Sequence, residues 1–270
     1  MQLFPQQWGQ QKPPVGTQLN RGHGLANGIV GQWLFNEGAG LWVNDSARNN
    51  GGVLTGGPSW AVGQFGPTLD FDGVDDYVSV PVVGGGTTDT ATLSAWVNVD
   101  GISANYIAIF EDGTNRKGLL IGGAAGNPLG YLWENTADEY NASSGLTLTI
   151  GVWHFVALVI TPTAATIYKD AQSWTNTKTH NAKNLDVTWH IGRDSSAADR
   201  FLNGKIDTGR LYNRALSPTE IAWLYTPPFA GMAMQRRYLL NTGAAPAAGQ
   251  PYLSRFHAVP FVPTYGRSLN

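Results

Sequence analysis

The chain has 270 residues, no cysteine, and 17 Lys and Arg against 19 Asp and Glu, which gives a formal net charge of -2. This balance excludes the concentrated positive charge that binding to nucleic acid or an anionic membrane needs. The missing cysteine excludes disulfides and thiolate chemistry. Only 13% of the residues are charged, whereas 34 are glycine, a composition typical of an all-β protein with many tight turns.

Residues 1–27 are rich in Gln, Pro and Gly and show neither helical nor strand periodicity, so we expect an extended N-terminal arm. The first residues, MQLFPQQWGQQKPPVG, contain no basic region followed by an apolar run. We therefore expect no secretory signal peptide. No stretch of the chain approaches the roughly 20 apolar residues of a membrane span.

Residues 28–226 carry the signals of many short strands. Apolar and β-prone stretches recur at short intervals and are bounded by Gly, Asn, Asp and Ser; they include GIVGQWLF, TLSAWVNV, WHFVALVI, ATIYKD, VTWHIGR and GKIDTGRLYNR. TLSAWVNV alternates Leu93, Ala95 and Val97 with Ser94, Trp96 and Asn98, whereas the continuous apolar run WHFVALVI predicts a strand that is buried on both faces or lies at the centre of a sheet. This pattern predicts a sandwich or jelly roll of antiparallel strands.

One helix is predicted near residue 220. Ser217 is a candidate N-cap, Pro218 stands at the first helical position, and Glu220 completes a capping box. The apolar side chains of one face follow at helical spacing (Ile221, Leu224 and Tyr225). Two prolines end the helix. Because it is short, we expect it to lie across a sheet edge. Residues 227–270 contain six prolines and no periodicity, which predicts a second, C-terminal arm.

Six stretches resemble, in their order, the laminin-G-like jelly roll of the concanavalin A-like lectin/glucanase superfamily. They are GQWLFNEGAG, DSARNNGGVL, LDFDGVDDYVSVP, LSAWVNV, GVWHFVALVI and GKIDTGRLYNRALSPTEI. The resemblance implies two stacked antiparallel sheets of about six or seven strands each. It also implies a role in binding carbohydrate or protein.

The flanks LNRGHGLANGIVGQWLFNEGAG and PPFAGMAMQRRYLL resemble those of laminin-G-like proteins encoded by tailed bacteriophages. This resemblance implies a non-enzymatic structural or decoration protein on the exterior of a virion. Residues 1–27 and 227–270 would then bind capsid or tail proteins and sister subunits in a homo-oligomer, and the jelly roll would bind host or environmental glycans. The alternatives are a carbohydrate-binding module of a secreted or cell-surface protein and, less favoured, a glycoside hydrolase.

Three aspartates in FDGVDDYVSVP, Asp72, Asp75 and Asp76, suggest either chemistry or a turn. Asp side chains accept hydrogen bonds from turn amides, and Gly73 tolerates a positive φ, so we expect a turn; part of a calcium site is the alternative. Glycosidases of the superfamily resemble one another in an E-x-D-x-E strand pattern. That pattern is missing here, and we assign no catalytic residue.

Calcium takes six to eight oxygen ligands. The first and last strands of such a fold lie close together, which makes Glu37, Asp45 and Asp207 candidate ligands for a structural calcium ion. Members of the family often carry a second acid after the position of Asp207, where this chain has Thr208. The alternative is that Glu37 and Asp45 cap turns.

A sugar site needs aromatic faces together with planar polar groups on loops. The candidates are Trp133, Tyr140, Trp174, Asn135, Asp138, Asn141 and Arg200. Packing in the core or between subunits is the alternative for each aromatic residue. His154 and His190 stand beside tryptophans in predicted strands, and we expect both to be packing residues with hydrogen bonds.

Overall fold

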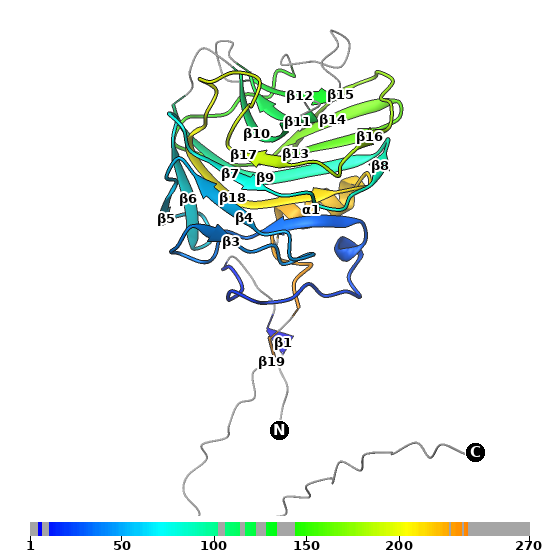
Figure 1. Cartoon of the computed structure of the whole chain (residues 1–270). Helices are drawn as coiled ribbons and strands as arrows, with labels where there is room; N and C mark the ends of the chain where they lie inside the picture. The colour runs from blue at the N-terminus through cyan, green and yellow to red at the C-terminus, as the bar shows by residue number, and fades with distance from the viewer. Residues whose placement is uncertain are drawn as a thin grey trace, which may run out of the picture. The chain divides into compact units, whose positions relative to one another are not determined.

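A computed structural model describes residues 5–6, 11–101, 106–113, 117–122, 128–133, 144–226, 228–233 and 235–236. The compact unit Pro5–Gln235 contains two antiparallel sheets that face each other (Figure 1). The predicted fold class, an all-β antiparallel sandwich of the jelly-roll type with one short helix, is confirmed. Of the described helices, none is long and apolar enough to be a membrane-span candidate.

The first sheet has seven strands. In spatial order they are β12 (Leu129–Trp133), β11 (Lys117–Ile121), β10 (Ile107–Asp112), β17 (Trp189–Ile191), β7 (Tyr77–Val80), β4 (Gly52–Thr55) and β3 (Trp42–Val43).

The second sheet has eight strands. Seven follow the order β15 (Gln172–Asn176), β14 (Ala164–Lys169), β13 (Trp153–Thr161), β9 (Ala91–Gly101), β18 (Asn203–Tyr212), β6 (Pro67–Asp72) and β5 (Ser59–Val62), and β2 (Ile29–Trp33) also pairs with β18. The other elements are β1 (Pro5–Gln6), η1 (Gly24–Ala26), β8 (Thr87–Thr88), which pairs with β16 (Lys183–Asn184), α1 (Pro218–Tyr225) and β19 (Gln235–Arg236).

Strand β13 shows why the chain needs a layer outside the sandwich. One set of its alternating side chains, Val156, Leu158 and Ile160, belongs to the core between the two sheets. The other set, Phe155, Ala157 and Val159, belongs to a second apolar cluster on the far face. The prediction that this strand is buried on both faces is confirmed.

Helix α1 covers that far face. The capping box is present as predicted: the Ser217 hydroxyl accepts a hydrogen bond from the Glu220 N–H, and the Glu220 carboxylate accepts one from the Ser217 N–H. Ile221 and Leu224 are buried in the second cluster, and Tyr225 stacks on Trp96 of the central strand β9 at a ring-centroid distance of 5.6 Å. The expectation that the helix lies across a sheet edge is wrong, because its apolar face needs the apolar outer face of β9 and β13.

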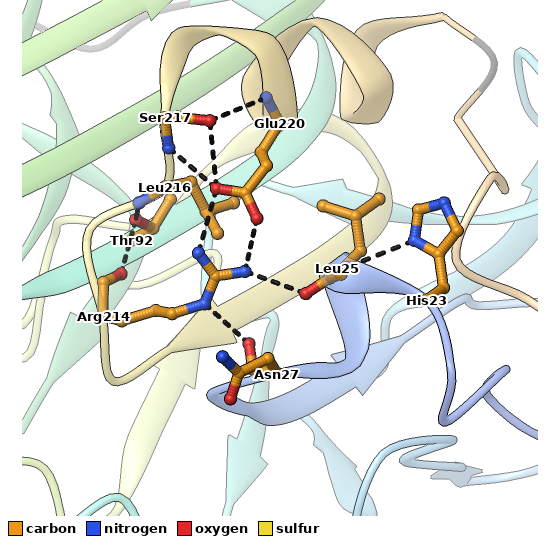
Figure 2. Close-up of polar contacts among 9 residues, drawn as sticks. His23, Leu25, Asn27, Thr92, Arg214, Leu216, Ser217 and Glu220 are labelled. Atoms are coloured by element: carbon orange, nitrogen blue, oxygen red, sulfur yellow. Dashed lines mark hydrogen bonds and ion pairs between the residues drawn. The ribbon is translucent and has the colours of Figure 1, made fainter.

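Residues 11–27 lie against the sandwich. Arg214 donates hydrogen bonds to the carbonyl oxygens of Gly24 and Asn27 and to the Glu220 carboxylate, which joins η1 to the start of α1 (Figure 2). The Arg214 hydrogen bonds lower the pKa of Glu220 to about 2. Leu25 is buried in the second apolar cluster. The contacts around η1 therefore combine apolar burial with charged hydrogen bonds.

Candidate functional site

The acidic cluster lies in the turn between β6 and β7. One carboxylate oxygen each of Asp72, Asp75 and Asp76 lies within 4.8 Å of the others. Asp72 Oδ1 accepts a hydrogen bond from the Val74 N–H at 2.8 Å, and Asp76 Oδ2 accepts one from the Asp72 N–H at 2.9 Å. Burial raises the pKa of Asp76. The expectation that these aspartates accept hydrogen bonds from turn amides is confirmed for Asp72 and Asp76, so the turn uses two of the three carboxylates.

The three candidate calcium ligands have different surroundings. Asp45 accepts hydrogen bonds from four backbone N–H groups, those of Gln32, Ala47, Arg48 and Asn50. Glu37 Oε1 accepts one from the Asn44 N–H. Asp207 is fully buried and forms an ion pair with Lys12. Asp45 therefore serves its own turn, while Glu37 and Asp207 both lie near Lys12.

The predicted sugar-site residues are not brought together where they are described. Trp133 has no exposed surface, belongs to the core between the sheets, and donates to the Asn181 carbonyl. Trp174 is half-buried and packs against the same core from β15. Arg200 Nη1 donates to Asp194 and to Ser196 at the surface. The other four predicted residues, Asn135, Asp138, Tyr140 and Asn141, lie outside the described residues.

The outer face of the seven-stranded sheet carries a continuous row of cross-strand neighbours. In an antiparallel sheet, paired residues point to the same face. On β4, β7, β17 and β10, a residue adjacent in sequence to the row's member belongs to the core, so the row itself points outward. The row, called here the outer row, consists of Leu132, Gly118, Glu111, His190, Ser79, Val53 and Trp42. Leu132 is buried, whereas Val53 and Trp42 are 45% and 49% exposed. The outer row thus passes from a buried apolar end through polar groups to an exposed tryptophan.

Glu111 is the buried acid of the outer row. Its side chain has no exposed surface, and its carboxylate accepts hydrogen bonds from the N–H and the hydroxyl of Ser195, the hydroxyl at 2.9 Å. Burial raises its pKa from 4.5 to about 7, although the Ser195 hydrogen bonds oppose the shift. A carboxyl group that titrates near neutral pH exchanges between hydrogen-bond donor and acceptor, which is typical of functional sites.

His190, the cross-strand neighbour of Glu111, and Arg193 carry unsatisfied polar atoms. His190 Nδ1 and Arg193 Nε are both buried and have no hydrogen-bond partner. The Arg193 guanidinium lies over the rings of Tyr77 and Phe201, 4.8 and 5.3 Å from their centroids. Burial, followed by the Arg193 charge, lowers the pKa of His190. Buried polar atoms without partners are rare in folded proteins, and this rarity distinguishes the two nitrogens from the other polar groups of the sheet face.

A β-bulge in β10 places Glu111 on the outer face. Ala108 pairs with Leu120, but Phe110 pairs with Leu119, so Ile109 is an extra residue. Without the bulge, simple alternation after the core residue Ile107 would point Glu111 into the core. The bulge directs Asp112 inward instead, where it forms a fully buried ion pair with Lys117.

The sequence stretches FEDG and VTWHIGR contain Glu111 and His190. The sequence pattern predicts a packing role for His190, and no catalytic pattern surrounds Glu111. Trp42 and Tyr77 were also missed as site residues. The signal that would have found Glu111 and His190 is a strand pairing that brings them opposite each other, and pairing is not visible in a single sequence.

Comparisons with known proteins agree with this architecture. A family described as the concanavalin A-like lectin/glucanases superfamily matches residues 72–222. No curated protein sequence matches the chain.

Solved structures of similar fold include three of interest. Domain 4 of AbnA, an extracellular GH43 arabinanase of Geobacillus stearothermophilus in complex with arabinotriose, has a TM-score of 0.61 at 18% identity, over 73% of this chain and 98% of that one. Trypanosoma rangeli sialidase in complex with sialic acid has a TM-score of 0.55 at 19% identity, over 74% of this chain and 33% of the sialidase. The binding domain of Paraclostridial Mosquitocidal Protein 1 has a TM-score of 0.57 at 13% identity, over 74% of this chain and 52% of that one.

Proposed function

This chain belongs to the concanavalin A-like lectin/glucanases superfamily, and from that membership we propose that it is a non-enzymatic carbohydrate-binding domain whose ligand lies along the outer row. The observation that carries the proposal is the pair of buried, unpartnered nitrogens of His190, the cross-strand neighbour of Glu111, and of Arg193, whose charge acts on His190. Sugar hydroxyls both donate and accept hydrogen bonds, and so would satisfy both nitrogens and the titrating carboxyl group.

The aromatic groups of the face support the same ligand class. Trp42 is 49% exposed at the open end of the outer row, and Tyr77 is half-buried beside His190. The apolar face of a sugar ring packs on such side chains, while its hydroxyls meet the polar groups between them. Two similar structures, the arabinanase domain and the sialidase, were solved with arabinotriose and sialic acid, which supports a carbohydrate as the ligand.

The carboxylates around Glu111 argue for binding without hydrolysis. Glycoside hydrolysis usually needs two carboxyl groups flanking the bond, about 5 to 9.5 Å apart. Asp112 pairs with Lys117 in the interior, and Asp194 pairs with Arg200 and accepts the Ser196 N–H. Both neighbouring acids in the described region are therefore engaged. Hydrolysis of an oligosaccharide that the protein binds would contradict this part of the proposal.

A glycan array with the purified protein tests the proposal. Trp42→Ala and His190→Ala should each weaken binding to the best glycan by roughly fivefold, since an aromatic contact contributes about 1 kcal/mol. Trp223→Ala is the matched control, because Trp223 is 41% exposed but lies on α1. Binding that is lost equally in the control, or that is unchanged in both outer-row variants, would refute the site.

We further propose that the domain is displayed on the exterior of a bacteriophage particle, as a decoration protein attached through residues 1–27 and 227–270 to capsid or tail proteins or to sister subunits. The resemblance of the flanking sequences to phage-encoded laminin-G-like proteins supports this placement. Mass spectrometry of purified particles should detect the chain at constant stoichiometry. Recovery only from the culture medium or the cell surface would favour the alternative, a secreted or cell-surface binding module.

A further inference from the structure

The side chain of Lys12 enters a cage of oxygen atoms beside β18. Its ammonium group donates to the carbonyl oxygens of Phe35, at 3.0 Å, and of Pro67, and it forms an ion pair with Asp207 Oδ1 at 2.6 Å. The Lys12 side chain is 3% exposed and that of Asp207 is fully buried. A lysine ammonium has three N–H donors, and three oxygens from three separate segments receive them.

Glu37 adds a second negative charge. Its charge favours the ammonium form of Lys12, whereas burial lowers the Lys12 pKa. Glu37 Oε2 is buried and has no hydrogen-bond partner. Burial likewise raises the pKa of Asp207, and the Lys12 charge opposes that shift. Each of the buried charges of Lys12 and Asp207 is therefore stabilised in its ionised form by the other.

These oxygens are the kind that a hard divalent cation binds, namely carboxylates and backbone carbonyls. A structural calcium ion does not fit this chain as expected, because Asp45 is committed to its turn and the ammonium group of Lys12 lies among the remaining oxygens. We infer that Lys12 supplies the cation for this cage in place of a metal ion, and so fastens the N-terminal segment to the sandwich independently of calcium.

The backbone around Lys12 is held as a fixed attachment requires. The Lys12 N–H donates to the Phe65 carbonyl at 3.1 Å, and the Asn36 side chain donates to the Pro13 carbonyl at 2.7 Å. Further along, Leu19 is buried against Met232 and Leu25 in the second apolar cluster. A cation attached to the chain in this way has a high effective concentration at the cage, which gives it an advantage over free ions.

Thermal unfolding of the full chain with EDTA or millimolar CaCl2 tests the inference. The wild-type Tm should be the same in both. Lys12→Met leaves Asp207 without its partner and should lower the Tm in EDTA by about 10 °C; CaCl2 should recover at least half of the loss, because the vacated cage then takes the ion. Lys169→Met, which removes a half-buried lysine on β14, is the matched control and should show no calcium response.

Two outcomes would overturn the inference: a wild-type Tm that falls in EDTA, or a Lys12→Met variant that calcium does not stabilise. If Lys12→Met folds poorly, the double variant Lys12→Met/Asp207→Asn still allows the test, because it removes both buried charges. It should be more stable in EDTA than Lys12→Met and should lose the calcium response. Equal stability of the two variants would mean that the Lys12–Asp207 pair does not hold the segment.

Discussion

Replacing Glu111 by Gln should abolish a large loss of unfolding free energy that the wild type undergoes as the pH rises to about 7. Burial raises the Glu111 pKa in the folded protein from 4.5 to about 7. One pKa unit corresponds to about 1.36 kcal/mol, so the shift amounts to about 3 kcal/mol in the free energy of unfolding. Gln has nearly the same shape, keeps an acceptor for Ser195, and does not titrate.

The sign follows from the raised pKa. Between pH 4.5 and about 7 the folded protein holds the Glu111 proton while the unfolded chain releases it. The stability that Glu111 contributes is therefore fully present below pH 4.5 and is lost as the pH rises to about 7. Relative to wild type, Glu111→Gln should gain about 3 kcal/mol between the two ends of this window.

Urea unfolding followed by tryptophan fluorescence, at intervals across this pH range, measures the effect. The difference between the two proteins isolates Glu111, since other buried acids such as Asp207 and Asp76 are present in both. Asp89→Asn, at an exposed position, controls for the loss of one negative charge. If wild type and Glu111→Gln give parallel curves over the whole range, Glu111 is not a buried titrating acid and its role in the outer row fails.

Three further substitutions probe the fold. Ser217→Ala removes the acceptor for the Glu220 N–H and should lower the unfolding free energy by about 1 kcal/mol in thermal unfolding, with Ser217→Asp close to wild type. Gly118→Ala puts a Cβ atom 2.2 Å from the Phe110 carbonyl oxygen and should lower the free energy of unfolding in urea by more than about 1 kcal/mol. A smaller decrease would contradict the close contact between the strands. Phe155→Ala should cost about 4 kcal/mol in the same assay, because its ring is fully buried between β13 and α1.

The fold was predictable because its signals are local. The apolar run of residues 153–160 indicated a strand covered on both sides, and Ser217 and Glu220 marked the helix start; both are present. The position of α1 was not predictable in the same way. The apolar face of α1 packs on a surface formed by Trp96, Phe155 and Val159, and this surface exists only because β9 and β13 are paired.

The candidate site was not predictable because it depends on strand register. Glu111 reaches the outer face only through the extra residue Ile109, and it meets His190 only because β10 pairs with β17. Aromatic residues near polar loops are the sequence signal for sugar contacts, and Trp133 carries that signal. That residue follows the core-facing alternation of β12 with Tyr131 and Leu129, and a single sequence does not reveal which face of a strand is covered.

Packing alone does not account for the outer row. A buried apolar residue of similar size at position 111 would avoid the cost of about 3 kcal/mol that Glu111 carries above neutral pH. His190 Nδ1 and Arg193 Nε add two further unpaired buried atoms, each of which costs on the order of 1 kcal/mol or more. These costs fall on the sheet face that also carries exposed Trp42. Buried polar atoms without partners also occur on the eight-stranded sheet, at Ser94, Thr208 and Arg210, so it is the exposed aromatic group on the same face that favours a ligand for the outer row.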